Sequence, residues 1–123
     1  MGQLDYYAGI DIGASNIKYG LVDSTGKVIF REIKPSHVSK GAKPLLHVIT
    51  NIAENLLLRA AEDDIPIKWL GVGTPGVVDI NTGKVIGVSP NIPGWVGTKL
   101  GSHLKEYLNL PVYVDNDANS MAL

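Results

Sequence analysis

Short apolar stretches separated by tight polar turns fill the opening part of the chain. Residues 6–13, 17–22 and 28–33 are each typical of a β-strand. The second connection, Ser24-Thr25-Gly26-Lys27, is a sequence that favours a turn between antiparallel strands. We therefore predict an antiparallel three-strand meander at the start of the chain.

A longer apolar pattern follows a polar loop over residues 34–43. Between residues 44 and 62 apolar side chains recur every three or four positions, which predicts an amphipathic helix. Pro44 stands at its first expected position, where the missing N–H has no intrahelical partner to lose. Asp63-Asp64-Ile65-Pro66 ends this helix.

The rest of the chain alternates strand and helix patterns. Residues 67–72, 85–88 and 111–114 are strand-like, and a second helical pattern lies before the last of them. Its apolar positions are Leu100, Leu104, Tyr107 and Leu108. The order β-β-β-α-β-(β)-α-β predicts an α/β fold over residues 1–123. Its mixed sheet holds the meander, followed by helix-separated parallel strands.

Composition and charge narrow the class of protein. Hydrophobic residues make up 45% and charged residues 19%, as in globular proteins. Eleven basic and twelve acidic residues are scattered along the chain, which argues against a nucleic-acid partner. The absence of cysteine excludes disulfides and thiolate metal sites. With no basic leader and no apolar run of about 18 residues, we predict a cytoplasmic protein without a membrane partner.

The first candidate site is Asp11-Ile12-Gly13-Ala14-Ser15-Asn16, which leaves the end of the first strand. Small residues let backbone N–H groups approach a phosphate, and an acid at this point can hold Mg²⁺ through water. The same residue types also favour an ordinary hairpin turn. The residues alone leave both interpretations open.

The second candidate, Gly71-Val72-Gly73-Thr74-Pro75-Gly76, matches the dinucleotide fingerprint G-x-G-x-x-G after a strand. That fingerprint must open a helix, whereas here Val77-Val78-Asp79 and a turn follow. No acid stands about 20 residues further on to hold a ribose hydroxyl. We reject a Rossmann site and retain the bend at Gly76 as a wall suited to a ligand cleft.

The third candidate is the loop from Ser89 to Trp95, which two prolines stiffen. It offers the Asn91 amide and the Trp95 indole, a pair suited to hydrogen bonding and stacking with a polyol ring. A rigid loop packed by its own tryptophan is an equally good interpretation.

The fourth candidate is Asp115-Asn116-Asp117, at the end of the last strand. Asn116 can donate and accept at once, as sugar hydroxyls require. Asp117 lies where a following helix would favour an ionised carboxylate, and helix capping explains one acid but not the three residues together. His37, His47 and His103 show no ligand spacing, so we predict no metal site for them.

Four segments in this order resemble the ROK family of sugar kinases and repressors, within the actin-like ATPase superfamily. They are Asp11 to Ser15, Gly73 to Asp79, Pro90 to Trp95 and Asn116 to Asn119. The likeness runs from about Tyr7 to the end. It implies a ribonuclease H-like, actin-like ATPase fold and a glucokinase-like activity. In that activity the γ-phosphoryl group of ATP passes to a hexose hydroxyl, with O6 of glucose as the default.

The resemblance also implies roles for single residues. Those matching the family's first phosphate loop are Asp11, Gly13 and Ser15, with Asp11 facing Mg²⁺ and the phosphates of ATP. The positions matching hexose-binding residues are Asn91 and Asn116, and Gly76 lies beside the same cleft. Asp117 matches the general base that accepts the proton of the sugar hydroxyl.

Two departures from the family pattern qualify these expectations. The family's loop usually reads Gly-Gly-Thr-Lys where this chain has Gly13-Ala14-Ser15-Asn16. The stretch from Ser15 to Gly20 also resembles polyphosphate-using glucokinases, so polyphosphate is an alternative donor.

The family's second half has no counterpart in these 123 residues. That half supplies the adenosine pocket and often a zinc site, so we expect no zinc here. We expect an N-terminal fragment that is inactive alone and forms a homo-oligomer through the face meant for the second half. A ROK-type transcriptional regulator and a non-catalytic sugar-binding module are the alternatives. The few residues before Tyr7 argue against the regulator.

Overall fold

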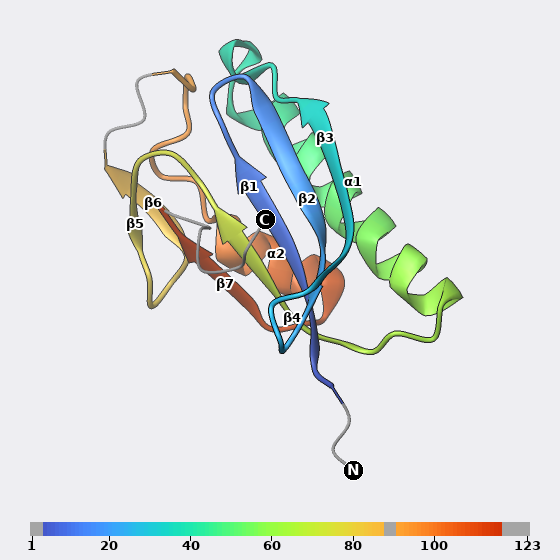
Figure 1. Cartoon of the computed structure of the whole chain (residues 1–123). Coiled ribbons are helices and arrows are strands. Elements are labelled where there is room, and N and C mark those ends of the chain that lie inside the picture. Colours follow the sequence, from blue (N-terminus) through green and yellow to red (C-terminus); the bar gives the residue numbers. More distant parts are fainter. Residues whose placement is uncertain (1–3, 88–90, 117–123) are drawn as a thin grey trace.

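A computed structural model describes residues 4–87 and 91–116 of the chain. Figure 1 shows the arrangement of its helices and strands. In chain order they are β1 (Tyr6–Ile12), β2 (Asn16–Asp23), β3 (Val28–Pro35), the 3₁₀ turn η1 (Val38–Lys40), α1 (Ala42–Glu62), β4 (Ile67–Gly73), β5 (Val77–Asp79), β6 (Lys84–Gly87), α2 (Leu100–Leu108) and β7 (Val112–Asp115).

The main sheet has five strands in the order β3-β2-β1-β4-β7. The pairs β1–β2 and β2–β3 are antiparallel, and the pairs β1–β4 and β4–β7 are parallel. The predicted mixed sheet, with its opening meander, is therefore confirmed. A separate antiparallel hairpin joins β5 to β6, and only its second strand was expected from the sequence.

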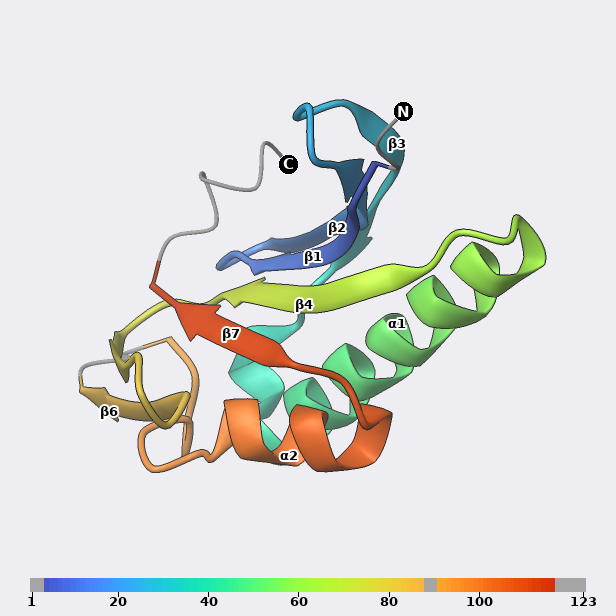
Figure 2. The ribbon, with the colours of Figure 1, turned by 90° about the horizontal axis from the view of Figure 1, so that it is seen from below.

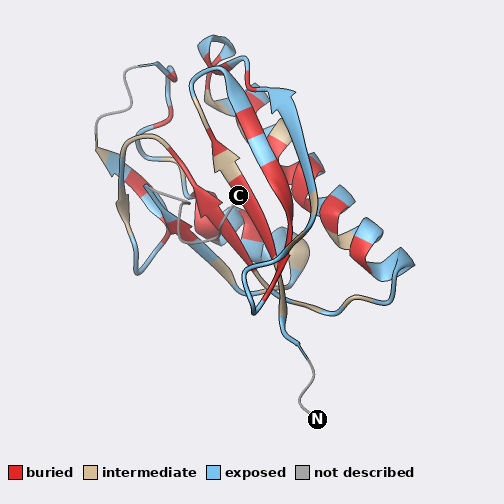
Figure 3. Cartoon of the chain, viewed as in Figure 1, coloured by how far each residue is buried: buried red, intermediate tan, exposed pale blue. Residues whose placement is uncertain are grey.

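Both long helices lie on one face of this sheet, as Figure 2 shows. Side chains alternate between the two faces of a strand, so every second residue meets the helices. Ile10, Leu70 and Val72 point this way and are buried, and Figure 3 shows the buried stripe along the strands and α1. No helix in residues 4–87 and 91–116 covers the opposite face.

The uncovered face carries a row of aromatic rings. Tyr7 and Trp69 lie opposite each other in β1 and β4, with ring centroids 4.4 Å apart. The ring of Tyr113 in β7 lies perpendicular to that of Trp69, with centroids 5.5 Å apart, and Tyr113 is 60% exposed. This face therefore presents apolar surface to solvent.

Helix α1 begins at Ala42, two residues before the predicted start. Pro44 is then the third helical residue, which is still within the first turn, where backbone N–H groups have no intrahelical partner. The first of these groups, on Ala42, donates instead to the carbonyl oxygen of Pro93 at 2.9 Å. The start of α1 is thus attached to the loop that carries Asn91.

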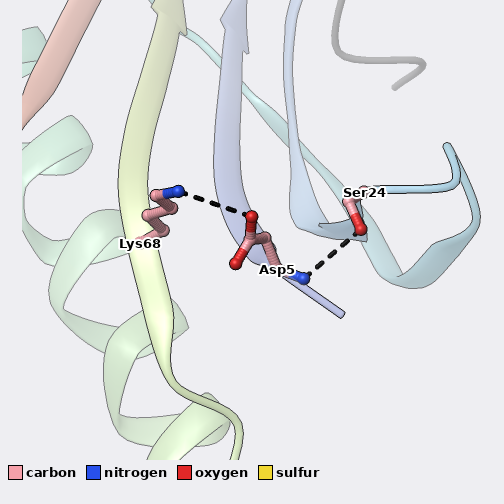
Figure 4. Close-up of polar contacts among 3 residues, drawn as sticks. All are labelled: Asp5, Ser24 and Lys68. Carbon is pink, nitrogen blue, oxygen red and sulfur yellow. Dashed lines mark hydrogen bonds and ion pairs between the residues drawn. The ribbon is translucent and has the colours of Figure 1, made fainter. Parts of the chain in front are cut away.

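The beginning of β1 is attached to its neighbours through Asp5, as Figure 4 shows. The Asp5 N–H donates to Ser24 Oγ at 3.3 Å, and its carboxylate pairs with Lys68 Nζ at 3.4 Å. Both charged side chains are at least half exposed, so the ion pair contributes less than about 1 kcal/mol. None of the helices described here is long and apolar enough to cross a membrane.

Candidate active site

The carboxyl ends of three parallel strands meet at one edge of the sheet. Asp11 of β1 pairs with Gly73 of β4, and Gly73 pairs with Asp115 of β7. Residues paired across strands point to the same face, so both carboxylates lie on the face without helices. Lys18 of β2 is the partner of Asp11 on the other side and adds a positive charge to the row.

The turn between β1 and β2 holds its shape through backbone hydrogen bonds. The Gly13 N–H donates to the carbonyl oxygen of Asn16 at 2.8 Å. A Cβ on Gly13 would lie 2.8 Å from that same oxygen, closer than side chains are found. Glycine is therefore required for closing the turn, which is the ordinary interpretation of this stretch.

A buried serine fastens the same turn to the end of β3. Ser36 Oγ donates to the carbonyl oxygen of Ala14 at 3.1 Å, and the Ser36 N–H donates to that of Ser15 at 3.0 Å. Ser36 is only 2% exposed, whereas Ser15 faces solvent. The backbone is thus fixed while the Ser15 side chain remains accessible to a ligand.

Ser15 and Asn91 line one cleft of about 520 Å³, although 76 positions separate them in sequence. His37 also lines this cleft, with its backbone in the left-handed region at φ 49°. Sequence reasoning placed His37 on a loop without a function, and no local pattern links it to Ser15. The cleft therefore joins two of the stretches selected from the sequence and adds one unexpected residue.

Thr74 connects the remaining segments of the site. Trp95 Nε1 donates to Thr74 Oγ1 at 2.8 Å, and the Thr74 N–H donates to the carbonyl oxygen of Asp115 at 2.9 Å. Thr74 is 2% exposed and Trp95 is fully buried. The indole is therefore not available for stacking on a ligand, and the interpretation of a loop packed by its tryptophan is correct.

Two further candidate residues lie beside these segments. Gly76 has φ 98°, a conformation that glycine adopts readily, and the strand β5 follows it. The expected absence of a Rossmann helix after the Gly71–Gly76 stretch is confirmed. Asn116 is exposed, and its N–H donates to Asp115 Oδ1 at 2.6 Å. Asp117 lies outside the described residues, as do Ser89 and Pro90.

The described residues contain no group of three or more His, Cys, Asp or Glu side chains placed to hold a metal ion. Magnesium bound to a nucleotide needs only one or two carboxylates, because phosphate and water oxygens complete its octahedron. Asp11, partly buried at the end of β1, fits that requirement.

Comparison with known proteins identifies the family of this chain. The sequence profile of the ROK family matches residues 7–123. The chain belongs to the ROK family. A xylose repressor from Caldicellulosiruptor bescii is 33% identical over 94% of this chain and 28% of its own length. A glucokinase from Thermotoga maritima is 31% identical over 94% of this chain and 34% of its own length.

Solved structures confirm the actin-like ATPase fold expected of this ROK domain. A ROK family glucokinase from Streptomyces griseus, in complex with glucose and AMPPNP, superposes with a TM-score of 0.75 at 26% identity. The match covers 96% of this chain and 34% of that enzyme. The chain thus spans about a third of the length of the relatives it matches.

Proposed function

We propose that residues 1–123 are the N-terminal domain of an ATP-dependent hexose kinase, with O6 of glucose as the first acceptor to test. The observation that supports this most is the cleft shared by Ser15 and Asn91. It places a residue of the proposed phosphate loop beside one of the proposed sugar loop. The register that aligns Asp11 and Asp115 on either side of Gly73 adds two acidic groups at the same edge of the sheet as the turn of Ser15.

On this proposal each segment binds one part of the reactants. The turn of Gly13 and Ser15 would hold the phosphates, and the Asp11 carboxylate would hold the magnesium ion through water. The bound Mg²⁺–ATP supplies the phosphoryl group and neutralises its charge. The residues that hold the hexose are Asn91, Asn116 and Gly76.

Asp117 is the proposed group that accepts the proton of the sugar hydroxyl. Phosphoryl transfer passes through a loose transition state, so a weakly basic aspartate is sufficient. Holding both reactants in line lowers the activation free energy by about 7–11 kcal/mol. Proton transfer to Asp117 adds about 10²–10⁴-fold to the rate.

We also propose that the isolated chain does not catalyse phosphoryl transfer. Ser15, Asn91 and Asn116 are exposed, so water surrounds the polar groups that would act on the substrate. Charges act weakly in water and strongly in a closed, dry site. Closure would come from the further two thirds of chain that the relatives possess.

The test is a phosphorylation assay of this chain alone and within the full-length protein, using glucose, fructose, mannose, allose and N-acetylated amino sugars. ATP and polyphosphate are offered separately, so the assay names the donor and the acceptor together. In the full-length protein Asp117→Asn should lower kcat about 10²–10⁴-fold with little change in the KM for sugar. The matched control is Asp63→Asn, an exposed acid at the end of α1. Near-normal turnover of Asp117→Asn would show that the assignment of the base is wrong.

A sugar-responsive regulator is the second candidate, because a xylose repressor is among the relatives with the highest identity. A regulator would bind sugar without consuming either donor. Saturable sugar binding by the full-length protein, with no phosphorylated product, would favour the regulator over the kinase.

A further inference from the structure

The residues from Ser36 to Ala42, which we call the linking segment, connect two loops of the candidate active site. At its start, Ser36 is hydrogen-bonded to the carbonyl oxygens of Ala14 and Ser15 in the turn between β1 and β2. At its end, the Ala42 N–H donates to the carbonyl oxygen of Pro93 at 2.9 Å. The linking segment therefore joins the proposed phosphate loop to the proposed sugar loop.

His37 lies within the linking segment, in a backbone conformation that few side chains adopt. Its φ of 49° and ψ of 42° fall in the left-handed region, where glycine and asparagine are more usual. Hydrogen bonds on both sides hold this conformation: Ser36 is bonded to the turn, and the His37 carbonyl oxygen accepts from the Lys40 N–H at 3.0 Å. Backbone strain of this kind is kept at ligand-binding positions more often than elsewhere.

The side chain of His37 lines the same cleft as Ser15 and Asn91. It is exposed, and it makes no capping hydrogen bond to the turn η1 that it precedes. An imidazole in its neutral form offers one donor and one acceptor, which a sugar hydroxyl can match. The ring of His37 is thus open to a ligand in the cleft.

The rest of the cleft favours a neutral ligand that carries several hydroxyl groups. Its polar lining consists of hydroxyl, amide and imidazole groups, beside the apolar side chains of Ala14, Pro35 and Val38. None of the described residues that line it is Asp, Glu, Lys or Arg. A few placed hydrogen-bonding groups on an otherwise apolar wall suit a sugar ring.

We propose that His37 is a specificity-determining residue that hydrogen-bonds one hydroxyl of a bound hexose. The inference rests on the proposed function in taking a hexose as the ligand, and it applies equally to a kinase and to a sugar-responsive regulator. One such hydrogen bond contributes about three- to tenfold to affinity. A site that hydrogen-bonds a hydroxyl also discriminates against sugars that lack it, so His37 helps to select which hexose binds.

The test is the affinity of the full-length protein for hexoses, measured by isothermal titration calorimetry. His37→Gly removes the imidazole and leaves a residue that adopts the left-handed conformation readily. Asp64→Gly is the matched control, because Asp64 has φ 55° beyond the end of α1 and does not line the cleft. We expect His37→Gly to raise the Kd for glucose, or for the hexose that binds most tightly, about three- to tenfold. Asp64→Gly should leave that Kd unchanged.

Deoxy analogues of the same hexose separate a direct contact from a change in the fold. Each analogue lacks one hydroxyl, and all of them are titrated into the wild-type protein and into His37→Gly. For one analogue, the affinity lost by the wild-type protein should not be lost again in His37→Gly, because the partner of that hydroxyl is already absent. A change in the fold would instead weaken the binding of every analogue by the same factor.

Results that contradict this inference differ from results that contradict the proposed kinase. Equal Kd values for His37→Gly and Asp64→Gly, or losses that multiply for every deoxy analogue, would show that His37 contacts no hydroxyl, even where the hexose is phosphorylated. Binding without a phosphorylated product would contradict the kinase alone, since the deoxy titrations would still show the contact of His37. A full-length protein that binds no hexose would overturn both proposals.

Discussion

Replacing Thr74 by valine tests whether one buried hydroxyl holds the candidate active site together. Thr74 Oγ1 accepts the Trp95 indole N–H at 2.8 Å and donates to the carbonyl oxygen of Pro75 at 3.2 Å. Valine has nearly the same shape but cannot accept a hydrogen bond. In Thr74→Val the Trp95 N–H therefore remains buried without a partner, because the side chain of Trp95 is fully enclosed.

The expected loss of stability follows from that unpaired donor. Burying an unsatisfied neutral donor costs about 1–3 kcal/mol. In urea, with a slope of about 2 kcal/mol per molar for a small protein, a loss of about 2 kcal/mol lowers the unfolding midpoint by about 1 M. Trp95→Phe removes the donor itself, so adding it to Thr74→Val should cost less than the sum of the two single losses, by about 1 kcal/mol.

The assay is urea unfolding followed by circular dichroism, with Thr98→Val as the control. Thr98 is only partly buried, so its replacement should change the free energy of unfolding by no more than about 0.5 kcal/mol. A midpoint for Thr74→Val equal to that of Thr98→Val would refute the reasoning. Additive losses in the double variant would show that the indole and the hydroxyl do not depend on each other.

Three further predictions concern the turn between β1 and β2, the loss of stability at acid pH, and the uncovered face of the sheet. Gly13→Ala should cost about 1–3 kcal/mol in urea unfolding, because its Cβ would lie 2.8 Å from the Asn16 oxygen; an unchanged midpoint would contradict this. The Thr25 hydroxyl hydrogen bond is the main cause that lowers the pKa of Asp23 below its ordinary 3.8, so the stability lost in Asp23→Asn should be largest at neutral pH. That difference should shrink as pH falls below about 3.8, and a pH-independent difference would refute the assignment. We also expect the chain to self-associate through the uncovered face, so Tyr113→Ser should weaken self-association in sedimentation more than Lys105→Ala does; equal sedimentation of the two variants would contradict this expectation.

Local patterns predicted the helices and the main strands because each needs only its own periodicity. The start of α1 was placed two residues late, since Pro44 is tolerated throughout the first turn and does not mark its first residue. The strand β5 was missed because Val77–Asp79 is only three residues long and shows no alternation of its own. Its pairing with β6 stabilises it as a strand.

The contacts inside the candidate active site could not be predicted from local sequence patterns. The hydrogen bond from Trp95 to Thr74 joins residues 21 positions apart, and only the fold decides that the indole is buried. The meeting of Ser15, His37 and Asn91 likewise depends on how β1, β3 and the loop after β6 pack together. The role of Asp117 rests on the family resemblance and remains a prediction.

The uncovered face of the sheet connects the folding of the chain to its proposed chemistry. Gly9 of β1 pairs with Gly20 on one side and Gly71 on the other, so three residues without side chains form a row across this face. Another segment can approach the backbone closely along such a row. Asp11 and Asp115 lie on the same face, two positions further along their strands from Gly9 and Tyr113. A segment that buries this apolar surface therefore also removes water from beside the two carboxylates. Covering the face and strengthening the electrostatics of the proposed active site are then one event, which is why we expect turnover only from the longer protein.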